Sequence, residues 1–358
     1  MHKDDQMTPN ERADAFINGK PMDRLMIIPF LTNTAARVLG ISFREERSSA
    51  RKMADAQIAS YDRFGQDGIS IEYTLHGIGA AMGTKMTDPV HDVQAIEEQV
   101  LKDLEDLNTL DFSLAYVDKD PWLRQALEAA SICMRDRGDE VSVGFGIPGP
   151  FSAANSIYPL EKLLKATRKQ PELVHQLLRK CTDVIKHLAL EGLAIGADIS
   201  IGDPVASGTI LSVKQYREFV KPYTAEINQA VIDAGSSCTY HICGDTSSIV
   251  MDMIETGCGV LSVDNTMDME VVTKQVGHLV PIIGNVDPVG VFQSANREEI
   301  FEATRVAVAK SYDNPMGYMI ATGCDIAGNA PLESVDLFME AGRYYGKMPL
   351  DSKLIGKI

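Results

Sequence analysis

The chain has 358 residues, of which 45% are hydrophobic and 23% are charged, a composition typical of a folded globular protein. Asp and Glu outnumber Lys and Arg by 50 to 34, and the net charge of −16 disfavours nucleic acids and anionic membrane surfaces as partners. No apolar run approaches the ~18 residues of a membrane-spanning helix. The polar amino terminus lacks a signal-peptide pattern, so we expect a cytoplasmic protein. Six cysteines are too few for a disulfide scaffold.

The amino-terminal residues predict a short helix. Thr8 can cap it, Pro9 suits its first position, and Glu11 stands three residues after Thr8, as in a capping box. Gly19 is expected to end this helix. We therefore expect a helical extension over residues 1–24, before the main fold begins.

After this helix, short β-like runs alternate with longer helical patterns. The expected strands are Leu25–Leu31, Gly68–Tyr73, Val141–Phe145, Asp198–Ile201, Cys238–Ile242, Val260–Val263, Val280–Gly284 and Tyr318–Ala321. The expected helices are Ser48–Phe64, Pro121–Arg137, Leu160–Glu191, Val213–Ala234, Ser247–Thr256, Arg297–Ser311 and Pro331–Tyr345. Eight strands separated by helices predict a parallel α/β fold, and their number favours a (β/α)8 TIM barrel over an open sheet. No low-complexity linker or repeat divides the sequence, so residues 1–358 are expected to form a single domain.

A glycine motif after the third expected strand has the spacing of a dinucleotide-binding loop, Gly144-x-Gly146-x-x-Gly149. Such a loop needs a following helix whose free amides hold a pyrophosphate. Pro148 and Pro150 flank the last glycine, remove two amide donors and are expected to disrupt the start of the helix. The segment is therefore interpreted as a loop at the carboxyl end of a barrel strand.

A stronger signal lies in the segment Thr239–Asp245, which contains a His-x-Cys pair. Side chains alternate along a strand, so His241 and Cys243 are expected on the same face, where imidazole and thiolate would supply half of a zinc site. Cys324 follows the last expected strand, and the carboxyl ends of all barrel strands open onto one rim. His241, Cys243 and Cys324 are therefore the predicted metal ligands. Three protein ligands leave a fourth position open, which is typical of catalytic zinc.

The open position could take water, a substrate thiol or a displaceable carboxylate. Asp264, which ends the sixth expected strand, is the candidate carboxylate and the predicted catalytic residue. Asp203 and Glu72 also stand near strand ends and could position a substrate, although surface carboxylates are the simpler interpretation of both. The other four cysteines are interpreted as small buried apolar residues, namely Cys133, Cys181, Cys238 and Cys258.

These segments together resemble the uroporphyrinogen decarboxylase superfamily. The residues that carry the resemblance are Arg12–Arg24, Gly196–Pro204, Ser212–Tyr223, His241–Gly244, Val263–Asp264, Ile283–Pro288 and Gly323–Asp325. The resemblance therefore covers nearly the whole chain. It implies a (β/α)8 barrel, in agreement with the number of expected strands.

Within that superfamily the sequence departs from the true decarboxylases. Those enzymes hold a polycarboxylate with an arginine-containing stretch near the amino terminus, of which Arg37 is the one possible equivalent here. The His-x-Cys pair with a distant third Cys instead resembles the branch of the methylcobamide:coenzyme M methyltransferases. That resemblance implies zinc on His241, Cys243 and Cys324, and it matches Asp264 to an acidic residue of the branch.

The resemblance thus implies a zinc-dependent corrinoid methyltransferase. Zinc would activate a thiol such as coenzyme M, and the thiolate would take a methyl group from a methylcobamide. The chain lacks an Asp-x-His-x-x-Gly segment for holding cobalt, so a partner corrinoid protein is expected to supply this cobalamin. The reverse direction, from a methyl donor to the corrinoid, is also open. The alternatives are a uroporphyrinogen decarboxylase-type enzyme without metal and a non-catalytic zinc barrel.

Overall fold

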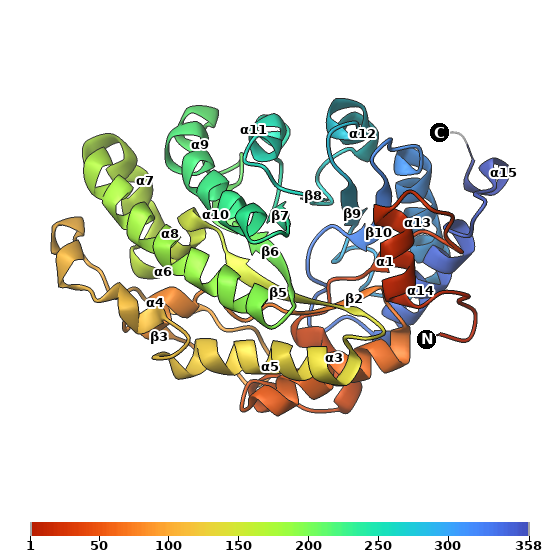
Figure 1. Ribbon diagram of the computed structural model, residues 1–358, viewed down its shortest axis with the longest axis horizontal. Helices are drawn as coiled ribbons and strands as arrows, with labels where there is room; N and C mark the ends of the chain where they lie inside the picture. Colours follow the sequence, from red (N-terminus) through yellow and green to blue (C-terminus); the bar gives the residue numbers. More distant parts are fainter. Residues whose placement is uncertain (1, 357–358) are drawn as a thin grey trace. The chain divides into compact units, whose positions relative to one another are not determined.

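The computed structural model describes residues 2–356, in which eight strands form one sheet in the order β1-β10-β9-β8-β7-β6-β5-β2 (Figure 1). The bounds of these strands are β1 Ile27–Ile28, β2 Gly68–Ile71, β5 Ser142–Pro148, β6 Asp198–Gly202, β7 Cys238–Ile242, β8 Val260–Val263, β9 Ile282–Val286 and β10 Tyr318–Thr322. Helices separate successive strands, and the fold is a (β/α)8 barrel. All eight predicted strands are present, and the predicted fold class is confirmed.

The strands at the two ends of this sheet order, β1 and β2, are linked through Asp67. The Asp67 amide donates to the carbonyl oxygen of Ile27 at 2.9 Å, and its carboxylate accepts from the Ile27 amide at 2.6 Å. The same carboxylate accepts hydrogen bonds from Arg12 and Arg24, both of which are buried. Paired and hydrogen-bonded in this way, the buried charges fix the amino-terminal residues against the first two strands.

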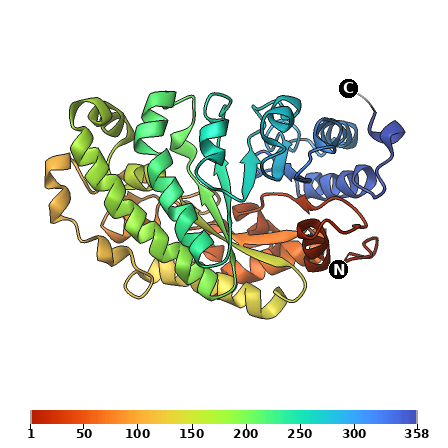
Figure 2. The same ribbon diagram turned by 45° about the horizontal axis from the view of Figure 1, so that its top comes forward.

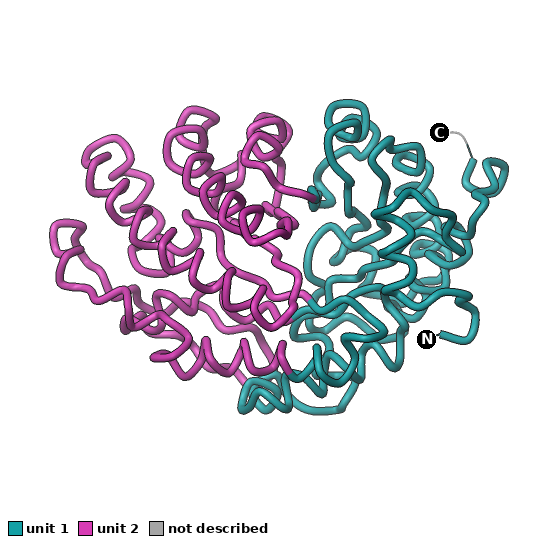
Figure 3. The backbone as a smooth tube through the Cα atoms, in the orientation of Figure 1, with its two compact units in different colours: residues 1–70, 132–143, 260–358 teal, residues 71–131, 144–259 magenta. Residues whose placement is uncertain are grey.

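The chain divides into two compact units, shown in different colours in Figure 3. Unit 1 comprises residues 1–70, 132–143 and 260–358. Its helices are α1 Pro9–Ile17, α2 Phe43–Glu46, α3 Ala50–Phe64, α12 Met269–Val276, α13 Arg297–Ser311, α14 Leu332–Tyr345 and α15 Ser352–Ile355, with a 3-10 turn over Asn33–Leu39. Helix α1 has the expected capping box between Thr8 and Glu11. Helix α13 packs against α14 and against β9 and β10.

Unit 2 comprises residues 71–131 and 144–259. Its helices are α4 Gly77–Ala81, α6 Pro150–Ile157, α7 Leu160–Lys169, α8 Pro171–Ala194, α9 Val213–Phe219, α10 Lys221–Asp233 and α11 Val250–Ile254, with 3-10 turns over Leu104–Thr109, Phe112–Ala115 and Pro204–Ala206. Helix α5, Pro121–Arg137, crosses the sequence boundary between the units. The long helix α8 packs against β6, α6 and α10 (Figure 2).

Two long helices predicted from the sequence are each split in the structure. The expected helix Leu160–Glu191 breaks between α7 and α8, where Pro171 begins the second helix and restricts the conformation of Gln170. The expected helix Val213–Ala234 breaks at Val220, and Pro222 lies in the first turn of the second helix, α10. A short antiparallel hairpin of β3 (Lys85–Met86) and β4 (Ile96–Glu98) was not predicted. Within residues 2–356, no helix is both long and apolar enough to cross a membrane.

Candidate metal centre

The end of β7 presents His241 and Cys243 together. Tyr240 and Ile242 are buried, whereas Thr239 and His241 on the opposite face of the strand are partly accessible. Cys243 follows the strand directly, and its Sγ lies 3.3 Å from Nε2 of His241. The predicted orientation of this pair on one face is confirmed.

Cys324 is delivered by β10, in which every residue is buried. Gly323 precedes it in a tightly packed position, because a Cβ atom there would lie 2.3 Å from the backbone nitrogen of Asn265. The amide of Gly323 also donates to the carbonyl oxygen of Val286 at 2.8 Å. After Cys324, the Asp325 carboxylate accepts hydrogen bonds from the amide and the hydroxyl of Thr32. The cysteine is therefore held from both sides along the chain.

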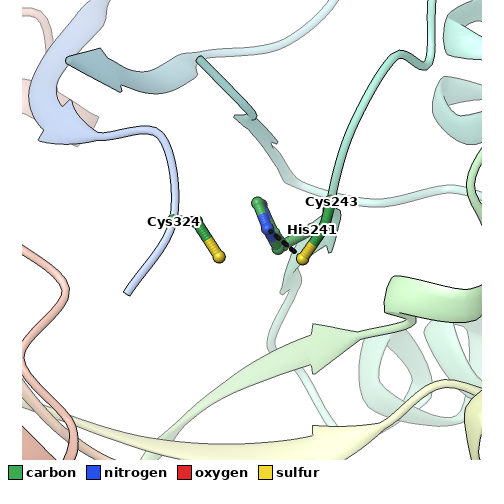
Figure 4. A group of neighbouring side chains, drawn as sticks. All are labelled: His241, Cys243 and Cys324. Carbon is green, nitrogen blue, oxygen red and sulfur yellow. Dashed lines mark hydrogen bonds between the residues drawn. The ribbon is translucent and has the colours of Figure 1, made fainter. Parts of the chain in front are cut away.

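His241, Cys243 and Cys324 form a group that could hold a metal ion (Figure 4). Each offers one ligand atom, and these atoms all lie within 4.8 Å of one another. Ligand atoms on one tetrahedral zinc are about 3.5 Å apart, given Zn–S near 2.3 Å and Zn–N near 2.0 Å, so small side-chain movements suffice. One imidazole and two half-buried thiols are a donor set that suits zinc.

Asp264, the predicted catalytic residue, is not part of this group. It follows β8, its side chain is buried, and Oδ1 accepts a hydrogen bond from the Thr266 amide at 2.9 Å. Its backbone carbonyl oxygen accepts from the side-chain amide of Asn285 at 2.9 Å. These bonds stabilise the turn after β8, so the observed contacts of Asp264 are those of a turn residue.

Asp203, for which a surface position was the simpler interpretation, is fully buried. Its carboxylate accepts hydrogen bonds from the amides of Phe151 and Ser152 and from the Ser152 hydroxyl, the latter at 2.6 Å. Burial raises the pKa of Asp203 to about 6, although these hydrogen bonds oppose the shift. The Asp203 amide also donates to the carbonyl oxygen of His241 at 3.0 Å, so Asp203 supports the end of β7.

The same contacts correct the interpretation of the glycine motif. Pro150 does not disrupt a helix start but occupies the first position of α6, where a proline has no amide to leave unpaired. The free amides of this helix are nevertheless bound by the Asp203 carboxylate and not by a ligand. A pyrophosphate would have to displace a buried protein carboxylate. A dinucleotide site is therefore disfavoured because Asp203 occupies the helix amides, and not because proline disrupts the helix, as the sequence suggested.

The remaining cysteines are packing residues, as predicted. Burial raises the pKa of the thiols of Cys133, Cys181, Cys238 and Cys258. A thiol binds a metal as thiolate, so this shift disfavours metal binding at all four. Cys243 and Cys324 are the half-buried exceptions.

The sequence profile of the family described as uroporphyrinogen decarboxylase (URO-D) matches residues 8–345. The chain belongs to this family. Methylcobamide:CoM methyltransferase MtbA of Methanosarcina acetivorans is 28% identical over 351 residues, which cover 95% of this chain and 99% of that protein. Uroporphyrinogen decarboxylase of Mannheimia succiniciproducens is 26% identical over 279 residues, which cover 75% and 73%.

A solved structure of a methyltransferase from Methanosarcina mazei superposes on this chain with a TM-score of 0.81 at 25% identity. The match covers 95% of this chain and 99% of the other. Both proteins therefore share the barrel along nearly their full length. Within the family, the chain is similar to methyltransferases over a larger share of its length than to the decarboxylase.

Proposed function

We propose that this chain is a zinc-dependent methyltransferase that moves a methyl group between a corrinoid on a partner protein and a small thiol. The observation that carries the proposal is the group of one histidine and two half-buried cysteines within 4.8 Å of one another. The relatives named methylcobamide:CoM methyltransferase, matched over nearly the whole chain, support it.

His241, Cys243 and Cys324 would hold the zinc ion. When bound, zinc lowers the pKa of a coordinated thiol, so that thiolate is present near neutral pH. The two cysteines keep the centre soft, because thiolate ligands donate charge to the metal. Asp203 holds the end of β7 through its bond to the His241 carbonyl, and Asp325 holds the segment that carries Cys324.

In the proposed reaction, the methyl carbon passes from the corrinoid to the sulfur. The carbon–sulfur bond forms as the carbon–cobalt bond breaks, and the electron pair of the broken bond stays with cobalt. The proton of the thiol is released to solvent when the thiolate forms. The same site can also act in the direction from a methylated donor to the corrinoid.

The contacts of Arg37 favour a methyltransferase over a decarboxylase. Its guanidinium donates hydrogen bonds to the carbonyl oxygens of Gly328 and Ala330. An arginine engaged with backbone carbonyls holds a loop, and a polycarboxylate substrate would have to compete with those bonds.

The test is metal analysis of purified Cys243→Ala and Cys324→Ala proteins, with Cys258→Ala as a matched control. Both ligand variants are expected to lose zinc and to lose methylcobalamin demethylation, measured spectrally with a set of thiols. Cys258→Ala is expected to keep both properties, because Cys258 is a buried packing residue. Full zinc retention in the two ligand variants would show that His241, Cys243 and Cys324 do not form the zinc site.

Asp264 is proposed as the displaceable fourth ligand. An Asp264→Asn variant is expected to retain zinc, because three protein ligands remain, and to change the KM for the thiol. An unchanged KM would leave Asp264 with its structural role in the turn after β8.

A further inference from the structure

The proposed zinc ligands include two thiols that lie close enough to react with each other. The Sγ atoms of Cys243 and Cys324 are within 4.8 Å of one another, and both side chains are half-buried. In Figure 4 the two sulfur atoms face the same space beside His241. The sulfurs of a disulfide are about 2 Å apart, so these two must approach by less than about 3 Å. Rotation about the side-chain bonds provides movement of this size.

His241 gives the two thiols different roles. Its Nε2 lies 3.3 Å from Sγ of Cys243, a position from which imidazole can accept the thiol proton as the sulfur reacts. Cys243 is therefore the nucleophile of the pair. Cys324 is the neighbouring thiol that attacks Cys243 once its sulfur has been oxidised. Accessible cysteines with a second thiol beside them are the usual sites of reversible oxidation.

A second pair of cysteines shows that proximity alone does not make a reactive pair. Cys238 is 1% exposed and Cys258 is 4% exposed, and burial raises the pKa of each thiol to about 12. The two lie near each other, because the charge of Cys258 also contributes to the raised pKa of Cys238. Both are closed to solvent and protonated at neutral pH, so a dissolved oxidant is expected to spare them. Cys133 and Cys181 are buried in the same way.

We propose that Cys243 and Cys324 form a reversible disulfide with a hydroperoxide as oxidant, and that this bond inactivates the metal centre. The inference rests on the proposed function for its consequence, which is the loss of methyl transfer. Both sulfurs bind zinc as thiolates, and a disulfide has no thiolate, so oxidation and metal binding exclude each other. Zinc therefore protects the pair. The oxidised protein regains its metal site only when a thiol reductant breaks the disulfide.

The oxidation has two steps. The Cys243 sulfur first attacks one oxygen of the hydroperoxide, so that a sulfur–oxygen bond forms and the oxygen–oxygen bond breaks. The departing oxygen takes up the thiol proton and leaves as water or an alcohol. The Cys324 sulfur then attacks the sulfenic acid, the sulfur–sulfur bond forms, and the sulfur–oxygen bond breaks to release water with the Cys324 proton. Two electrons pass in total from the two sulfurs to the peroxide.

The test uses the full chain in its zinc-loaded form and in a metal-free form prepared with a chelator. Both are treated with hydrogen peroxide, free thiols are counted, and disulfides are mapped by peptide mass spectrometry without reduction. The metal-free protein is expected to fall from six free thiols to four, with Cys243 linked to Cys324 in the same chain. Zinc at 100 times its Kd should slow this reaction about 100-fold, because only the metal-free fraction reacts. Dithiothreitol should restore all six thiols and zinc binding.

Three variants test the roles of the individual sulfurs. Cys324→Ser should accumulate a sulfenic acid on Cys243, which a 1,3-diketone probe traps, because no second thiol is present to resolve it. Cys243→Ser should form no disulfide and should take up less probe at Cys324. Cys238→Ala is the matched control, since it removes one thiol of the buried pair and should leave the rate and the product unchanged.

Six free thiols remaining in the treated metal-free protein would overturn the inference. So would oxidation of Cys243 to a sulfinic acid in place of the disulfide, a disulfide between two chains, or an equal rate with and without zinc. If methyl transfer requires zinc but no disulfide forms, the proposed function stands and the inference fails. If the zinc-protected disulfide forms but no thiol is methylated, the switch at the metal centre stands and the proposed function fails.

Discussion

The two strand ends that carry the proposed metal ligands, β7 and β10, are stabilised by different contacts. At the end of β7, two proposed ligands lie two residues apart, and the strand is partly accessible on their face. Its support is the fully buried Asp203, which joins the carbonyl of His241 to the start of α6. At the end of β10, the third proposed ligand, Cys324, follows a wholly buried strand, and the half-buried Asp325 that comes after it is hydrogen-bonded to Thr32. The comparison shows that strand alternation brings the His241–Cys243 pair to one face, whereas the position of Cys324 depends on contacts of the residues on both sides of it.

The largest expected effect comes from a pair of glycine substitutions. In Gly323→Ala, the new Cβ would lie 2.3 Å from the Asn265 nitrogen, so the backbone must shift. We expect the free energy of unfolding to fall by about 3 kcal/mol and zinc binding to be lost. In Gly202→Ala, the new Cβ meets nothing within 4 Å. The free energy of unfolding should therefore stay within about 0.5 kcal/mol of wild type, and the zinc content should be unchanged. Denaturant unfolding and metal analysis measure both. Equal effects of the two substitutions would contradict the proposed tightness of the β10 end.

A smaller, pH-dependent effect is expected at the β7 end. The folded protein holds the proton of Asp203 more tightly than the unfolded chain, since its pKa rises from 3.8 to about 6. The resulting stabilisation is present below pH 4 and is lost as the pH rises through 6. The free energy of unfolding of wild type should therefore fall between pH 4 and 6 by up to about 3 kcal/mol more than that of Asp203→Asn. Parallel pH profiles of the two proteins would show that Asp203 does not titrate in this range.

The smallest effect is expected from Asp325→Asn at the β10 end. The side chain is only partly buried, so we expect less than about 1 kcal/mol of lost stability. Its hydrogen bonds hold the segment that carries Cys324, and outer partners of metal ligands are typically worth about tenfold in affinity. Competition with a zinc chelator measures this change. Asp351→Asn, an exposed helix cap, is the control and should have unchanged zinc affinity. Unaltered affinity in Asp325→Asn as well would mean that Gly323 alone positions Cys324.

The sequence predicted the eight strands and the His241–Cys243 pair because those signals are local, and it added Cys324 because the strand ends of a barrel open onto one rim. Each strand has its own run of β-forming residues, and His241 and Cys243 are separated by a single residue. The supports of the site were not predicted, because they join residues far apart in the chain. Asp325 and Thr32 are 293 residues apart, and Asp203 and Ser152 are 51 apart. The helix breaks near Pro171 and Pro222 were missed because the apolar pattern continues across both of them.

The open space over Gly202 has a consequence for how such a protein could diversify. A Cβ atom at this position would meet nothing within 4 Å, although Gly202 pairs with His241 on the neighbouring strand. A small side chain acquired there would therefore change the surroundings of His241 at little cost to the fold. Natural selection could test such changes beside the site without first having to repair the barrel.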